Sequence, residues 1–145
     1  MTTRAAIATG SPAAVALRVV TAAGLVVDAV IHLDLASGYQ EAAPGGIGEG
    51  NLFRAQAVAA LVIAVFVLVR GSRAAYLASA VVAASALAAV LLYRYVDLPA
   101  LGPLPSMYEP LWFPTKTATA VAEAVALAGS LVGLSAVTRT PGERT

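Results

Sequence analysis

The sequence has no cysteine among its 145 residues and few charged residues of either sign. The missing thiols exclude disulfides, cysteine catalysis and thiolate-bound iron–sulfur clusters. Charged residues make up 12% of the chain, whereas soluble domains contain about a quarter. Such a chain has too little polar surface to cover itself in water. The net charge of +1 provides no basic field, so we expect no nucleic-acid partner.

What the sequence does contain is long apolar runs. Its residues are 59% hydrophobic and its mean hydropathy is +0.82. About 20 apolar helical residues cross a bilayer core, and the alternating pattern of barrel strands is missing. We therefore predict one all-α domain over residues 1–145, an up-down-up-down bundle of four transmembrane helices in contact with the lipid bilayer. The predicted helices cover about 13–35, 52–69, 74–96 and 115–137.

Glycine and proline mark the connections between these runs. Glycines crowd the predicted loop 36–51, and five prolines lie in the predicted loop 97–114, where they exclude a regular helix. A short turn at 70–73 joins the second and third helices. The polar tail 138–145 is predicted to be disordered.

The arginines predict the orientation in the membrane. Residues 37–50 and 98–114 contain no lysine or arginine. Basic residues favour the cytoplasmic side of a membrane protein, so we predict a multi-pass protein of the cell membrane with both termini in the cytoplasm and both long loops outside. The arginines on the predicted inner side are Arg4, Arg70, Arg73, Arg139 and Arg144.

The first predicted helix carries a polar stripe. Arg18, Thr21, Asp28 and His32 follow one another at helical spacing and share one face. A carboxylate facing lipid is costly, so this face should point into the bundle. Arg18 is near the inner end, where its side chain can reach water.

Glu123 repeats this pattern in the fourth predicted helix. It lies about 12 Å inside the outer end of its helix, and Asp28 lies at a similar depth in the first. We do not expect two carboxyl groups at this depth to be ionised together without partners. One of them should take a proton or lie beside a cation. Together with basic and aromatic residues near the outer helix ends, they predict an outward-facing ligand pocket. The candidate pocket residues are Asp28, His32, Arg54, Tyr93, Arg94, Lys116 and Glu123.

Two interpretations of this cluster stay open. In one, the charges form buried ion pairs that fix the register of the helices. In the other, they line a functional pocket in which His32 handles protons near neutral pH. Asp28 and His32, with Glu123 as a third donor, could also ligate a metal. Because the chain has one histidine and no H-E-x-x-H motif, we predict no metal and no other cofactor.

Small residues suggest close helix contacts. Gly129 and Gly133 form a G-x-x-x-G pattern in the fourth helix, which permits close helix approach. Packing within the bundle is one explanation. A homodimer through these glycines, or a membrane partner protein, is the alternative.

A few residues resemble a known type of protein. His32-Leu33, Tyr39, Gly46-Ile47-Gly48 and Phe53 are similar to a pattern in small four-helix bacterial membrane proteins without an assigned activity. In size and helix count the chain also looks like DoxX-type proteins, a family associated with membrane redox and stress complexes. This resemblance implies an architecture and carries no residue roles.

From these observations we predict a binding or accessory protein rather than an enzyme. Its outer pocket would hold a small polar or amphipathic ligand, or dock a membrane partner. The alternatives are a small proton-coupled transporter, or a membrane enzyme that moves protons with His32 and the carboxyl groups of Asp28 and Glu123.

Overall fold

The computed structural model describes residues 10–137, which form four α-helices and no strands apart from a single bridge between Leu101 and Leu104. Each helix is long and apolar enough to cross a membrane. The all-helical prediction and the number of candidate spans are therefore confirmed for this part of the chain. The helices are α1 (Pro12–Ala42), α2 (Glu49–Arg70), α3 (Arg73–Tyr95) and α4 (Pro114–Val137).

The first helix is longer than predicted. It continues through Gly38, because a single glycine within a helix costs only about 1 kcal/mol relative to alanine. The helix ends where the Ala43 N–H donates to the Tyr39 carbonyl. The helix α2 starts three residues early, at Glu49. The predicted loop 36–51 thus shrinks to residues 43–48. At about 46 Å, α1 is longer than the hydrocarbon core of a bilayer, which is about 30 Å thick.

Capping residues explain where the other helices begin and end. Ser11 accepts a hydrogen bond from the Ala14 N–H, and Pro12 occupies the first turn. Gly71 ends α2 with φ of 51°, a conformation that favours glycine. Ser72 then caps α3 by accepting from the Ala75 N–H. The turn between α2 and α3 is consequently very short.

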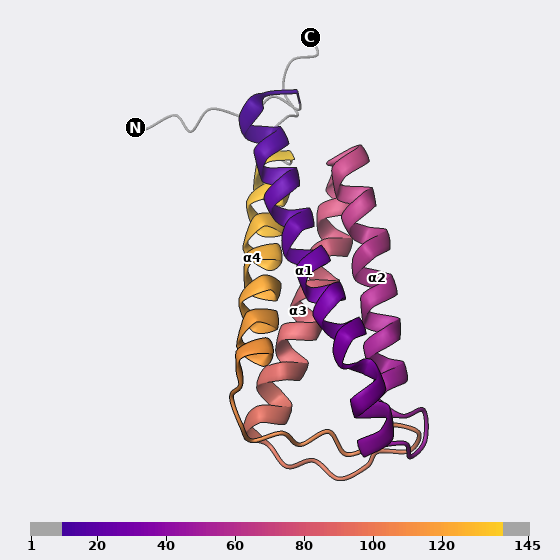
Figure 1. The fold of residues 1–145 in the computed structure, drawn as a ribbon. Coiled ribbons are helices and arrows are strands. Elements are labelled where there is room, and N and C mark those ends of the chain that lie inside the picture. Colours follow the sequence, from indigo (N-terminus) through magenta and orange to yellow (C-terminus); the bar gives the residue numbers. More distant parts are fainter. Residues whose placement is uncertain (1–9, 138–145) are drawn as a thin grey trace.

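The proline-rich segment 96–113 crosses one end of the bundle (Figure 1). It is held there by main-chain hydrogen bonds from Ile47 N–H to the Pro103 carbonyl and from Glu109 N–H to the Tyr93 carbonyl. The two long connections therefore meet at the same end. The predicted disordered tail 138–145, and Arg4, Arg139 and Arg144, lie outside the described residues.

The helices pack through small side chains. The helix α1 packs against α2 and α4 (Figure 1). The helix α3 has a more extensive contact with α4 than it has with α2. Buried alanines such as Ala57, Ala60 and Ala126 surround Leu25. Small residues let helices approach closely when lipid gives no hydrophobic driving force between them. Large aliphatic side chains, for example Val62 and Val121, lie exposed on the outside, which is compatible with a membrane protein.

The glycine pair of α4 lies inside this bundle. A Cβ atom on Gly129 would lie 2.3 Å from Thr21 Oγ1, and one on Gly133 would lie 2.5 Å from the Tyr76 ring. Both glycines thus serve contacts of α4 with α1 and α3. In this arrangement the G-x-x-x-G pattern serves packing within the bundle, where both glycines are buried.

Candidate functional site

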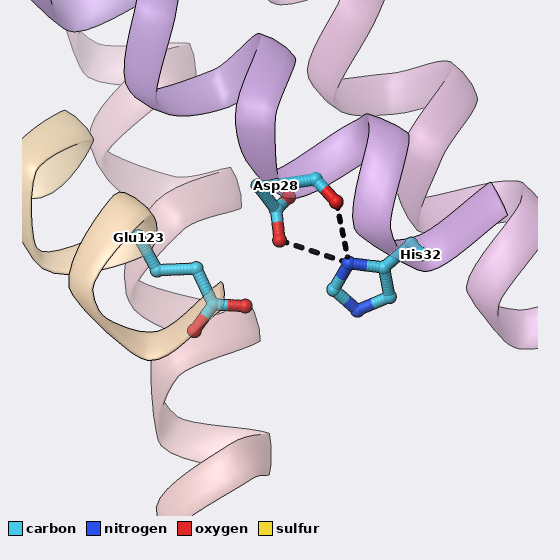
Figure 2. A group of neighbouring side chains, drawn as sticks. All are labelled: Asp28, His32 and Glu123. Atoms are coloured by element: carbon cyan, nitrogen blue, oxygen red, sulfur yellow. Dashed lines mark hydrogen bonds and ion pairs between the residues drawn. The ribbon is translucent and has the colours of Figure 1, made fainter. Parts of the chain in front are cut away.

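Three ionisable side chains meet in the core of the bundle. Asp28 and His32 come from one face of α1, and Glu123 comes from the facing side of α4 (Figure 2). One donor atom from each residue lies within 4.8 Å of the other two. The relative exposure of Asp28 and Glu123 is 1% each, and that of His32 is 8%. The structure therefore brings these three predicted residues together.

Asp28 is held by two neighbours. The Gln56 side chain of α2 donates to Asp28 Oδ2 at 3.1 Å. His32 Nδ1 lies 2.9 Å from Asp28 Oδ1 and 3.0 Å from the Asp28 carbonyl oxygen. Of these two oxygens the carbonyl oxygen has the hydrogen-bond geometry, and it accepts from Nδ1 in the tautomer that carries the ring proton there. Asp28 Oδ1 accordingly makes a close contact with His32 but has no hydrogen bond within the described chain.

Glu123 has no such support. Neither of its carboxyl oxygens has a hydrogen-bond partner among residues 10–137. Its carboxyl group extends from α4 toward Asp28 and His32 (Figure 2). A buried polar group without a partner is strongly disfavoured. A proton shared with Asp28, or a bound cation, would remove this cost.

These donors could hold a metal ion. Two carboxylates and an imidazole are common ligands of divalent transition metals. The prediction of no metal rested on the single histidine and the missing H-E-x-x-H motif. The structure brings this histidine together with two carboxyl groups from separate helices.

A cavity of about 350 Å³ adjoins this cluster on the side of the loops. All four helices and the segment 96–113 contribute to its wall. Most of the lining is apolar or aromatic, for example Phe53, Leu104 and Phe113. Ligand pockets typically combine such a wall with a few polar groups. The ionisable and polar residues of the lining are His32, Tyr39, Glu49, Gln56, Ser85, Tyr93, Glu109, Lys116 and Thr119.

Three of the seven predicted pocket residues line this cavity, namely His32, Tyr93 and Lys116. Asp28 and Glu123 are not part of its wall, but they lie directly beside His32. His32 is thus the group shared by the buried cluster and the cavity.

Arg54 and Arg94 do not line the cavity. Arg54 is exposed and donates to Asn51 on its own helix at 2.8 Å. The buried face of α2 is the one that presents Ala57 and Ala60, which leaves Arg54 outside. The Arg94 guanidinium packs instead on the rings of Tyr95 and Trp112, 4.9 and 5.9 Å from their centroids.

Several residues of the cavity lining were not among the predicted pocket residues. Glu49 is buried in the first turn of α2, where a carboxylate favours the helix dipole. Tyr39 donates to Glu109 at 3.5 Å and so connects α1 to the proline-rich segment. Lys116 donates to the Glu109 carbonyl. Gln56, a lone amide in the apolar run of α2, carried a sequence signal, because a polar side chain in a membrane span needs a partner.

No family model, curated protein or solved structure matches this chain. The resemblance to DoxX-type proteins therefore carries no weight beyond four long apolar helices.

Proposed function

We propose that the chain is a multi-pass protein of the cell membrane, an up-down-up-down bundle with both termini in the cytoplasm. The arginine distribution supports this orientation, since Arg70 and Arg73 flank the α2–α3 turn and the opposite loops contain no basic residue between 37–50 or 98–114. In this orientation the 350 Å³ cavity lies at the outer end of the bundle.

The proposed function is the binding of a small amphipathic molecule in this cavity, in a binding or accessory role. The observation that carries it is the cavity wall itself. Apolar and aromatic side chains form most of it, while His32, Glu49 and Lys116 reach it from three helices. Such a wall suits a ligand with an apolar body and a polar end.

A proton-coupled carrier is the second candidate. It is favoured by the proximity of Asp28 and Glu123, whose donor atoms lie within 4.8 Å in a buried position beside the cavity. Paired carboxyl groups inside a membrane commonly exchange protons. A carrier would show pH-dependent flux in proteoliposomes that His32→Ala alters.

The binding proposal can be tested by filling the cavity. Ala89 and the neighbouring Ala88 are both exposed, but only Ala89 lines the cavity. We would titrate 1-aminoanthracene, a fluorescent amphipathic probe, into nanodiscs that contain wild type, Ala89→Phe or Ala88→Phe, and subtract the signal of empty nanodiscs. We expect saturable binding that Ala89→Phe weakens about tenfold or more, equivalent to about 1.4 kcal/mol. Ala88→Phe should bind like wild type. Equal binding by both variants, or none by wild type, would contradict the proposal.

A further inference from the structure

We propose that Asp28, His32 and Glu123 bind a divalent transition-metal ion in the core of the bundle. The three side chains come from α1 and α4 and turn toward one another (Figure 2). Their donor atoms already lie within 4.8 Å. Donor atoms bound to one ion at about 2.1 Å lie at most about 4.2 Å apart. The remaining contraction of about 0.6 Å is within the reach of a glutamate side chain.

The strongest reason is the state of Glu123. Its relative exposure is 1%, and both of its carboxyl oxygens lack a hydrogen-bond partner in the described part of the chain. Leaving one such group unsatisfied in a low-dielectric interior is costly. Glu123 has two unsatisfied oxygens that point toward a second carboxylate. A bound cation between the two carboxyl groups would provide the partner that these oxygens lack.

Charge balance favours a divalent ion over a single proton. Two ionised carboxylates and a neutral imidazole neutralise a charge of +2. One proton shared between Asp28 and Glu123 would leave a charge of −1 unless His32 were protonated as well. Uncompensated charge inside a membrane protein is strongly disfavoured.

The donor set also limits which ions fit. One nitrogen and carboxylate oxygens suit Zn²⁺, Mn²⁺ or Fe²⁺, whereas Cu⁺ prefers the thiolate or thioether sulfur that this cluster lacks. Calcium takes six to eight oxygen ligands, more than these residues provide. The ion is therefore one of the divalent first-row transition metals.

Two features outside the three ligands support the site. Gln56 holds Asp28 Oδ2 at 3.1 Å, as hydrogen-bond partners commonly orient metal-binding carboxylates. His32 lines the 350 Å³ cavity, which gives an ion a path from the outer end. Three protein ligands would leave a coordination position for water or another small ligand.

The experiment measures metal bound by the full-length chain. Protein purified in detergent would be stripped with a chelator, incubated separately with Zn²⁺, Mn²⁺ or Co²⁺, desalted and analysed by inductively coupled plasma mass spectrometry. We expect about one ion per chain for at least one of these metals. The visible absorption of bound Co²⁺ would report direct ligation. Glu123→Gln, which keeps the shape but removes the anionic donor, should lose the ion and this absorption.

Matched variants separate the site from non-specific binding. Glu41→Gln removes a carboxylate of α1 that lies outside both the cluster and the cavity wall, and it should keep the ion. Gln56→Ala should weaken binding about 10- to 100-fold, because Asp28 loses its orienting partner. If Glu123→Gln does not fold, as judged by helical circular dichroism, Asp28→Asn takes its place.

Failure of this proposal would be distinct from failure of amphipathic ligand binding, which is measured with a different probe. Wild-type protein that retains none of the three metals would overturn the metal site. Metal content that is unchanged in both Glu123→Gln and Asp28→Asn would overturn it too. If the metal-free wild type is no more stable than Glu123→Gln and binds no ion, a shared proton is what Asp28 and Glu123 hold.

Discussion

Glu123 and Asp28 differ in how well the surrounding residues support them. Asp28 accepts a hydrogen bond from Gln56 and contacts His32, whereas neither oxygen of Glu123 has a hydrogen-bond partner within residues 10–137. Removing the Glu123 carboxylate and removing the Asp28 carboxylate should therefore have different effects on the stability of the fold. This difference separates the two interpretations of the cluster, a structural network of charges and a functional site.

In metal-free protein, we expect Glu123→Gln to leave the free energy of unfolding unchanged or to raise it by about 1 kcal/mol or more, because one of two adjacent buried carboxylates is removed. Asp28→Ala should lower it by about 1–3 kcal/mol, since Gln56 then loses its acceptor and His32 loses its contact with the carboxyl group. Thermal unfolding in detergent with a chelator measures both. If Glu123→Gln destabilises the fold as much as Asp28→Ala, the carboxyl groups belong to a structural network instead.

At the scale of the helices, the contact between α1 and α4 positions the cluster. Gly24 lies at this contact, where an added Cβ would be 2.7 Å from the Ala122 carbonyl oxygen and 3.0 Å from the Ala126 nitrogen. These are main-chain atoms, so the two helices would have to separate. Ala126 is only one turn of α4 from Glu123, and a separation here would also move the carboxyl group away from Asp28.

We predict that Gly24→Ala destabilises the protein by about 1–3 kcal/mol through this overpacking. Gly38→Ala is the matched control, since Gly38 also lies in α1 but has open space around it. Alanine favours a helix by up to about 1 kcal/mol over glycine, so the control should be neutral or stabilised. Chemical or thermal unfolding of the two variants provides the comparison. If both variants changed the stability equally, the α1–α4 contact at Gly24 would have to be less tightly packed than in this structure.

At the scale of the whole molecule, the two ends of the bundle differ in charge and in chain length. The short α2–α3 turn carries Arg70 and Arg73 at one end, and the two long connections 43–48 and 96–113 lie at the other (Figure 1). The orientation proposal assigns the first end to the cytoplasm. Because the chain has no cysteine, introduced thiols can test this without background.

Ala74 and Ala100 are exposed at opposite ends of the bundle. We expect a membrane-impermeant maleimide to label Ala100→Cys in intact cells. Ala74→Cys should react only after the membrane is permeabilised. Labelling is read by a mass shift on gels, with wild type as the blank. The reverse pattern would mean that the cavity opens toward the cytoplasm.

The sequence by itself determined the features that depend on local chemistry. The number of candidate spans follows from the length of the apolar runs. The turn at residues 70–73 follows from Gly71, which ends one helix, and Ser72, which caps the next. The shared face of Asp28 and His32 follows from their spacing of four. The predicted end of the first helix was wrong, because Gly38 only weakens a helix and the residues around it still favour its continuation to Ala42.

Only the tertiary structure decided which side chains meet across helices. Hydrogen bonds along each helix fix its shape, but its rotation and depth relative to the others depend on contacts between distant residues such as Gly24 and Ala126. Those contacts bring Glu123 beside Asp28. They also turn Arg54 outward. For this reason the buried cluster could be predicted from two helical faces and their depths, whereas the cavity and its contribution from the proline-rich segment could not.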